Sequence, residues 1–182
     1  RWHHHPGGQA AHGGRSPRPD PARRMTSPRA GRPHMPGYGI ATGQEGILPW
    51  EWAQKRLENT RNYFVVSSRP DGRPHVMPVW ALWLDGLLWF STARTSTKAR
   101  NLLANPQISV AVEHGDEAVI LEGTAIVEED HDVLEPVWAA YKAKYEWDVT
   151  GESMFFVTPR LVFAFIESSE QFAATATRWR FL

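Results

Sequence analysis

The apolar residues between positions 62 and 127 fall in short runs rich in Val, Ile, Trp, Leu and Phe, which turn residues separate. Asp85-Gly86 divides two of these runs and predicts a β-hairpin. Pro70-Asp71-Gly72 and His114-Gly115-Asp116 predict two further turns. The strands we expect are 62–68, 76–84, 87–92, 107–113, 118–127 and 161–167. Consecutive hairpins of this kind favour an antiparallel meander.

Helical periodicity is confined to three segments. Pro49 begins a predicted helix that ends near Arg61, with Trp50, Ala53 and Leu57 on one face. A second helix is expected over 131–144, with Val133, Val137 and either Tyr141 or Ala140 turned inward. The third is short and precedes Asn105-Pro106. About six antiparallel strands with so few helices predict a mainly β fold, a small six-stranded barrel with flanking helices, because closure removes exposed strand edges.

The third helix begins at a Thr/Ser cluster and is the strongest candidate for chemistry. Thr95 or Ser96 can cap it, and Ala99, Leu102 and Leu103 form its apolar stripe. Backbone N–H groups at a helix start bind anions, and the hydroxyls of Ser96 or Thr97 with the Lys98 ammonium would complete a phosphate site. Lys98 and Asn101 lie on one face. The alternative is an ordinary capped surface helix.

Charge is unevenly distributed although the chain is formally neutral. Residues 1–34 hold seven arginines and only Asp20, so residues 35–182 carry 13 basic against 19 acidic side chains, a net charge of −6. Against this acidic part, Arg94, Lys98 and Arg100 concentrate three positive charges near the third helix. A local basic patch suits a small anionic ligand better than nucleic acid, which needs an extended basic surface. We therefore expect no nucleic-acid partner.

The composition excludes several kinds of chemistry. Cysteine is absent, so disulfides, thiolate metal sites and a cysteine nucleophile are excluded, and a redox reaction would need a bound cofactor. The acidic run at 128–132 is explained by the positive end of the following helix, and we expect no metal site. No apolar run approaches the roughly 20 residues that span a bilayer, and no apolar region follows Arg23-Arg24. We expect no membrane partner and a cytoplasmic location.

The first 45 residues are rich in Pro, Gly, Arg and His and lack apolar periodicity. This composition predicts a disordered tail over 1–45, followed by a single folded domain over 46–182. Met25 and Met35 lie within the tail, and we expect the working protein to begin near Met35. His3 to His5 could bind a metal loosely, and the arginines could contact nucleic acid, but a solvated tail accounts for both.

From residue 48 to 182 the sequence resembles the split-barrel flavoproteins related to pyridoxamine 5′-phosphate oxidase. The strings that carry the resemblance are PWEWAQKRLENTRNYFVVSSRPDGRPHVMPVW, FSTARTSTKARNLLANPQISVAV, VILEGTA and the closing ATRWRF, in this order and spacing. The similarity is closer to the actinobacterial branch that binds the deazaflavin coenzyme F-420. It implies the FMN-binding split-barrel fold, and a homodimer with two cofactor sites at its interface.

The resemblance also implies roles for individual residues. Positions that match the family's phosphate site and its supporting asparagine are Ser91, Thr92, Ser96, Thr97, Lys98 and Asn101, with Arg94 and Arg100 attracting the anionic tail of the cofactor. Positions that match the strand along the cofactor ring are Pro78, Val79 and Trp80. Among the tryptophans, Trp80 could contact the ring, although core packing is the ordinary role of strand tryptophans.

Two departures from the FMN oxidases argue against pyridoxamine-phosphate oxidase activity. Those enzymes usually have Arg-Lys where this chain has Thr97-Lys98, and they end on an Arg-Leu-x-Pro type sequence where this chain has Arg178-Trp179-Arg180-Phe181. We expect this ending to be docked, either as simple packing or as part of the partner subunit's pocket through Arg178 and Trp179.

These features together predict an oxidoreductase that binds F-420 and transfers a hydride to an unsaturated organic acceptor, the small-molecule partner. His75, at the start of the second strand, could act as its general acid, or could simply be a histidine satisfied at a strand end. The alternatives are an FMN-dependent oxidase or reductase of the same fold, and a non-catalytic flavin-binding protein.

Overall fold

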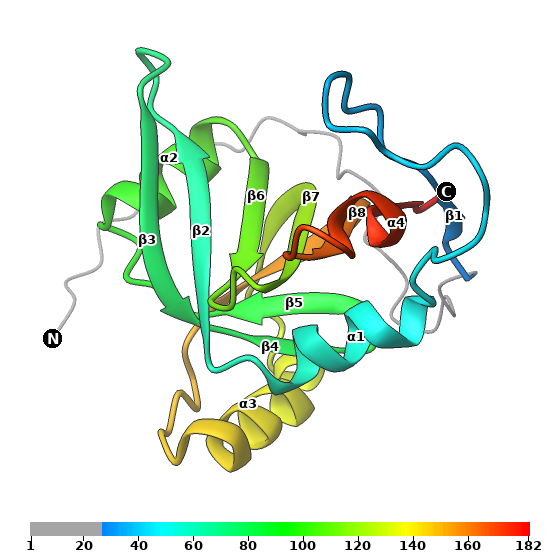
Figure 1. Ribbon diagram of the computed structural model, residues 1–182. Helices are drawn as coiled ribbons and strands as arrows, with labels where there is room; N and C mark the ends of the chain where they lie inside the picture. The colour runs from blue at the N-terminus through cyan, green and yellow to red at the C-terminus, as the bar shows by residue number, and fades with distance from the viewer. Residues whose placement is uncertain (1–26) are drawn as a thin grey trace, which may run out of the picture.

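The computed structural model describes residues 27–182, in which nine strands and four helices build one antiparallel sheet with flanking helices (Figure 1). The strands are β1 (Arg29–Gly31), β2 (Asn62–Ser68), β3 (Pro74–Trp80), β4 (Leu82–Leu84), β5 (Leu87–Phe90), β6 (Gln107–Val112), β7 (Glu117–Glu128), β8 (Met154–Ile166) and β9 (Thr177–Arg180). The helices are α1 (Trp50–Asn59), α2 (Thr97–Ala104), α3 (His131–Tyr145) and α4 (Phe172–Thr175).

The strand order is β1-β9-β8-β7-β6-β2-β3, and β5 pairs with both β4 and β8. The long strand β8 holds two neighbours on one edge, since residues 155–157 pair with β5 and residues 161–164 pair with β9. The segment 74–84 returns the sheet on itself, because its first part pairs with β2 and its second part with β5. This confirms the expected mainly β, six-stranded barrel, built from β2, the β3–β4 segment, β5, β8, β7 and β6.

The segment expected as one strand over 76–84 is in fact broken at Ala81. The Ala81 N–H donates to Tyr145 Oη at 3.0 Å, and its carbonyl accepts from Tyr145 Oη at 2.6 Å and from Lys144 Nζ at 3.0 Å. These groups of α3 replace the strand partners that Ala81 lacks, so the chain can bend here without leaving buried backbone groups unsatisfied. At this corner no hydrogen-bonded strand pair joins the two parts of the barrel. The chain itself links them, running from β3 through Ala81 into β4.

Two clusters of apolar side chains form the core. The larger lies inside the barrel and includes Tyr63, Val65 and Leu121, and α1 covers one of its ends with Ala53 and Leu57, as its periodicity predicted. The smaller lies between α3 and the β4–β5 hairpin, with Trp89, Trp138 and Phe156 among its members. Val137 and Tyr141 of α3 are buried as expected, whereas Ala140 is only partly buried.

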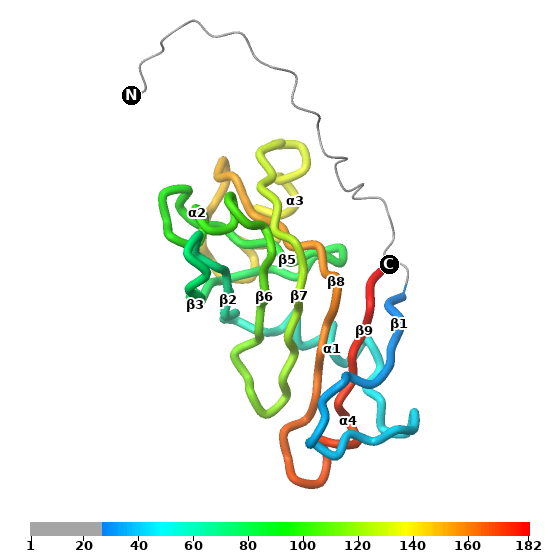
Figure 2. The backbone as a smooth tube through the Cα atoms, turned by 90° about the horizontal axis from the view of Figure 1, so that it is seen from above, coloured from blue at the N-terminus to red at the C-terminus, as the bar shows by residue number. Residues whose placement is uncertain are grey.

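The outer face of the sheet carries a continuous row of side chains. Cross-strand partners place Pro78, Phe64, Ala111, Ile120, Phe163 and Arg178 side by side from β3 to β9. Most of this row is apolar, and Phe64 is 41% exposed. In both Figure 1 and Figure 2, β3 and α2 lie at one side of the sheet and β1 lies at the other, and Figure 2 shows β9 beside β1.

Part of the segment expected to be a tail is ordered. β1 pairs with β9, with Arg29 opposite Arg180. Arg32 donates to the carbonyl oxygens of Gly43, Glu45, Ala174 and Ala176 at 2.6 to 3.0 Å. The expectation of disorder is thus wrong for residues 29–32, which precede the expected start at Met35. His3 to His5, Asp20 and Met25 lie outside the described residues.

Two local predictions are also corrected. Leu103, expected in the apolar stripe of α2, is 53% exposed. The last core strand is longer than the predicted 161–167, because β8 begins at Met154 and continues through Pro159. Pro159 is tolerated because the register with β7 shifts between Glu122 and Gly123, beside it.

Candidate functional site

The N-terminus of α2 has the geometry expected of an anion site. Ser96 is the N-cap, and its Oγ accepts a hydrogen bond from Ala99 N at 3.1 Å. Thr92 Oγ1 lies 3.1 Å from Ser96 Oγ, so the end of the β5 segment meets the helix start. Within the described chain, the backbone N–H groups of Thr97 and Lys98 have no acceptor, as is usual for the first helical turn. These two donors are available to a negatively charged oxygen.

Lys98 is a buried cation beside this helix start. Its side chain is only 8% exposed, and within residues 27–182 it forms no hydrogen bond and no ion pair. Its Nζ lies 5.9 Å from the centre of the Phe90 ring. Burial lowers the pKa of Lys98 below its ordinary value. A buried ammonium without a carboxylate partner is costly, and a bound anion would offset that cost.

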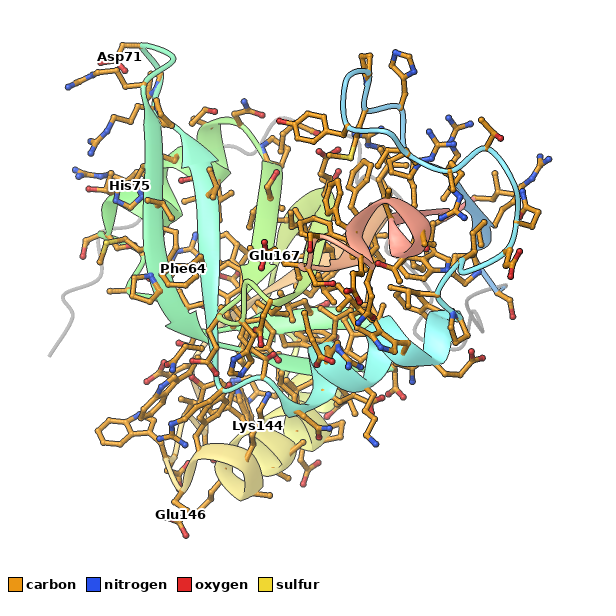
Figure 3. The ribbon with its side chains drawn as sticks, viewed as in Figure 1. Phe64, Asp71, His75, Lys144, Glu146 and Glu167 are labelled. Carbon is orange, nitrogen blue, oxygen red and sulfur yellow. The ribbon has the colours of Figure 1, made fainter. Side chains whose placement is uncertain are left out.

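Asn101 faces the same side of α2 but is occupied by a contact within the protein. It is 3% exposed, and its Nδ2 donates to Ser67 Oγ of β2 at 3.1 Å. Ser67 is the cross-strand partner of His75 on β3, so the three residues belong to one region. Figure 3 shows His75 on the β2–β3 hairpin, between the turn at Asp71 and the position of Phe64. His75 Nδ1 is buried and has no hydrogen-bond partner among the described residues.

Two expected site residues are engaged by acidic side chains. Ser91 Oγ donates to Glu152 Oε2 at 2.5 Å. Arg94 forms an ion pair with Glu129, with Nη1 2.6 Å from Oε1. Both pairs lie at the surface, so the positive charge of Arg94 is already balanced in this structure. Arg100 is exposed.

The strand expected along the cofactor ring is mixed in its exposure. Pro78 is exposed, whereas Val79 is 8% exposed and belongs to the barrel core. The ring of Trp80 is stacked on that of Tyr145 at 4.9 Å with an interplanar angle of 7°, and the Arg61 guanidinium lies 5.2 Å from its centre. Trp80 remains partly exposed.

The structure does not bring Arg178 and Trp179 to the α2 region of the same chain. Both lie on β9, at the opposite side of the sheet (Figure 2). Trp179 is 1% exposed and packs edge-on against Trp50 at 5.5 Å, which makes it a core residue. Arg178 lies on the outer face, and burial together with neighbouring Arg180 lowers its pKa. Its Nε is buried and has no partner among the described residues.

A polar cluster under the corner at Ala81 was not anticipated from the sequence. Lys144 Nζ donates to Tyr63 Oη at 3.1 Å as well as to the Ala81 carbonyl, and Tyr63 Oη donates to the Leu57 carbonyl. Burial lowers the pKa of Lys144 from 10.5 to about 8, although Glu113 opposes this shift. Burial raises the pKa of both Tyr63 and Tyr145. The available signal was the period-two pattern of β2, which puts Tyr63 on the same face as Val65.

Two further features are absent from residues 27–182. No group of three or more His, Asp or Glu side chains in this part of the chain is placed to hold a metal ion. No helix within the same residues has both the length and the apolar character needed to cross a membrane.

The residues at α2 fit the phosphate end of a flavin-type cofactor. The observation that supports this is the unpartnered, buried Lys98 beside two free N–H groups and the hydroxyls of Thr92 and Ser96. A phosphate requires several donors and a positive charge in this arrangement. The exposed Pro78 and the partly exposed Trp80 provide a surface for a flat ring. The fold and site thus define a class, the split barrels with an anion site at a helix start.

Comparison with known proteins identifies the family. The profile of the pyridoxamine 5′-phosphate oxidase family matches residues 51–176, well over half of the chain, and the protein belongs to this family. This confirms the resemblance at the level of the family. No curated protein sequence matches the chain.

Solved structures of low sequence identity share the fold. An F-420 reductase is 21% identical with a TM-score of 0.51, covering 60% of this chain and 94% of its own. A conserved hypothetical protein of Mycobacterium tuberculosis is 22% identical with a TM-score of 0.59, covering 68% and 88%. A pyridoxamine 5′-phosphate oxidase-related, FMN binding protein of Nostoc punctiforme is 17% identical with a TM-score of 0.51, covering 69% and 88%.

Proposed function

We propose that this protein is an oxidoreductase that binds the deazaflavin coenzyme F-420, with the phosphate at the start of α2, and passes a hydride to an unsaturated organic acceptor. The observation that carries the proposal is Lys98, a buried cation with no partner of its own among the described residues, beside free helix N–H groups. Membership of the family and the fold shared with an F-420 reductase support it.

The bound cofactor supplies the hydride chemistry, since the chain contains no redox-active side chain. The protein binds and orients it. Lys98, Ser96 and Thr97 hold the phosphate, while Asn101 fixes α2 against β2 through Ser67. Pro78 and Trp80 provide the surface against which the ring lies.

His75 is the proposed proton donor to the acceptor. Its position on β3 places it beside α2, and its buried Nδ1 has no partner among the described residues. In this proposal the His75 ring donates the proton that the acceptor needs when it takes up the hydride.

The working form proposed here is a homodimer formed through the outer face of the sheet. The row from Pro78 and Phe64 to Phe163 is a partly exposed apolar surface, of the kind that marks an interface. In a two-fold arrangement the same patch meets itself. With the axis along the strands and through the centre of the patch, the β9 side of one subunit faces the β3 side of the other. Arg178 would then approach the cofactor of the partner subunit. This would explain how it can contribute to a cofactor site although it lies far from α2 of its own chain.

Sedimentation equilibrium tests the dimer. We expect twice the monomer mass for the full chain, and monomer for Phe64→Asp, which places a charge in the centre of the proposed interface. If the unaltered protein sediments as a monomer at micromolar concentration, the dimer and the role of Arg178 in trans are both rejected.

Ligand titration tests the function itself. The full chain is titrated separately with F-420 and with FMN while tryptophan fluorescence is followed. We expect saturable binding of F-420, and Lys98→Met, which keeps most of the aliphatic stem but removes the charge, weakens it roughly 10- to 100-fold, the value of one charge-assisted hydrogen bond. Lys55→Met on α1, an exposed position, is the matched control and leaves the dissociation constant unchanged.

The outcomes separate the candidate functions. Tighter binding of FMN than of F-420 would assign the protein to the FMN-dependent oxidases and reductases. Binding of F-420 without turnover of any acceptor would indicate a carrier. An unchanged affinity in Lys98→Met would remove the phosphate site at α2 from the account.

A further inference from the structure

Acidic side chains of the protein already engage two residues near the start of α2. Arg94 is paired with Glu129 at 2.6 Å, and Ser91, the residue before Thr92, donates its hydroxyl to Glu152 at 2.5 Å. Within residues 27–182, Lys98 and Arg100 have no carboxylate partner, and only Lys98 is buried. Arg100 is two residues from Lys98 on the same helix and therefore points to a different side.

Glu152 brings a negative charge close to the expected phosphate. Ser91 directly precedes Thr92, and since consecutive Cα atoms are about 3.8 Å apart, the two hydroxyls are at most roughly 9 Å apart. Thr92 Oγ1 in turn lies 3.1 Å from the cap oxygen Ser96 Oγ. The carboxylate of Glu152 thus lies no farther from Thr92 than on the order of the roughly 10 Å over which charges interact at 0.1 M salt.

The position of Glu152 is fixed by two separate contacts. Its carboxylate accepts from Ser91, and its backbone carbonyl accepts from Trp138 Nε1 at 3.0 Å. Trp138 is 5% exposed, within the α3 core. These contacts hold the loop between α3 and β8 against the end of β5. The chain continues from this end of β5 into α2 (Figure 1).

We propose that Glu152 makes this site selective for a phosphodiester over a phosphomonoester. A phosphodiester carries one negative charge, which Lys98 balances, whereas a phosphomonoester carries close to two above its second pKa of about 6. Within the described residues of one subunit, Lys98 is the buried cation beside this site, and the second charge lies on the side of the Glu152 carboxylate. This inference rests on the proposed function. The cofactor phosphate of F-420 is a diester and that of FMN is a monoester, so the selection favours the former.

The test uses one ring in three forms: without phosphate, as the 5′-monophosphate, and as the monomethyl ester of that phosphate. The ring is whichever of deazaflavin and isoalloxazine binds in the titration above, and binding is measured at pH 8 by fluorescence. For the unaltered protein we expect the methyl ester to bind about three- to tenfold tighter than the monophosphate. In Glu152→Gln, which can keep the hydrogen bond from Ser91, this preference falls to less than twofold.

Glu51→Gln on α1 is the matched control, an exposed carboxylate on a different helix, and it keeps the preference. The form without phosphate binds equally to all three proteins. If the monophosphate binds as tightly as the methyl ester, or if Glu152→Gln leaves the ratio unchanged, the inference is overturned while the phosphate site stands. If removal of the phosphate does not weaken binding, or if neither ring binds at all, the proposed function fails together with the inference.

Discussion

Lys144 offers a sharp test of the polar cluster under the β3–β4 corner. Its ammonium is held between Tyr63 Oη and the Ala81 carbonyl, yet burial lowers its pKa from 10.5 to about 8. The folded protein therefore binds this proton less tightly than the unfolded chain does. Replacement by Met, which keeps an unbranched apolar side chain, removes the charge. The Ala81 carbonyl still accepts from Tyr145, and Tyr63 still donates to Leu57.

The sign follows from proton linkage. Below pH 8 Lys144 is protonated in both the folded and the unfolded protein, and the full cost of the buried charge is present. Between pH 8 and 10.5 the unfolded chain holds more protons than the folded protein, so the free energy of unfolding rises with pH. The change in the pKa of Lys144 from 10.5 to about 8 corresponds to a free energy of roughly 3.4 kcal/mol. Because the side chain keeps contact with solvent, we take about 1 to 2 kcal/mol. Above pH 10 the raised pKa values of Tyr63 and Tyr145 act in the opposite direction, since the folded state then holds more protons.

Urea unfolding followed by tryptophan fluorescence at pH 7, 8, 9 and 10 measures this effect. We expect Lys144→Met to be as stable as the unaltered protein at pH 7, or up to about 1 kcal/mol more stable, because a buried charge is replaced by apolar packing. The difference between the two proteins should change by about 1 kcal/mol in favour of the unaltered protein from pH 8 to pH 10. Lys142→Met, an exposed position paired with Asp148, is the control and shows no such trend. The reasoning would be refuted if Lys144→Met lost more than about 2 kcal/mol of unfolding free energy at pH 7 and its stability then changed with pH in parallel with that of the unaltered protein.

Two further predictions concern the reaction and the sheet. His75→Gln should lower the turnover of an acceptor at least tenfold and leave the dissociation constant of the cofactor within twofold, since a proton donor acts after binding. Turnover equal to that of the unaltered protein in steady-state assays would show that His75 has only a structural role. Gly123→Ala should destabilise the fold by about 2 to 3 kcal/mol or more, because a Cβ at this bulge would meet the Thr158 carbonyl oxygen at 2.2 Å. Thermal unfolding measures it, and a melting temperature within 1 °C of the unaltered protein would show that the bulge relaxes freely.

Local signals in the sequence were sufficient for most of the barrel. The strand at 62–68 was predicted correctly, and of the two expected caps, Thr95 and Ser96, the second is the N-cap. Alternation and capping depend on nearby residues, which is why local patterns predict them. The break at Ala81 was not predictable in this way. The residues around it are apolar on both sides, and the groups that permit the bend, Tyr145 and Lys144, come from α3 more than 60 residues later.

The same limit applies to the site. Spacing placed Lys98 and Asn101 on one face of α2, but it could not show that this face is buried, or that Asn101 bonds to Ser67. The acidic partners of Ser91 and Arg94 come from Glu152 and Glu129, and no local pattern pairs residues so far apart. The aromatic character of Trp179 predicted docking of the C-terminal segment, which is confirmed by its burial in the core.

A crystal structure of the full chain with bound F-420 tests the central claim most directly. The account predicts the cofactor phosphate within hydrogen-bond distance of Lys98 Nζ and of the N–H groups of Thr97 and Lys98, with the ring against Pro78 and Trp80. A phosphate bound elsewhere, with Lys98 still unpaired, would contradict it.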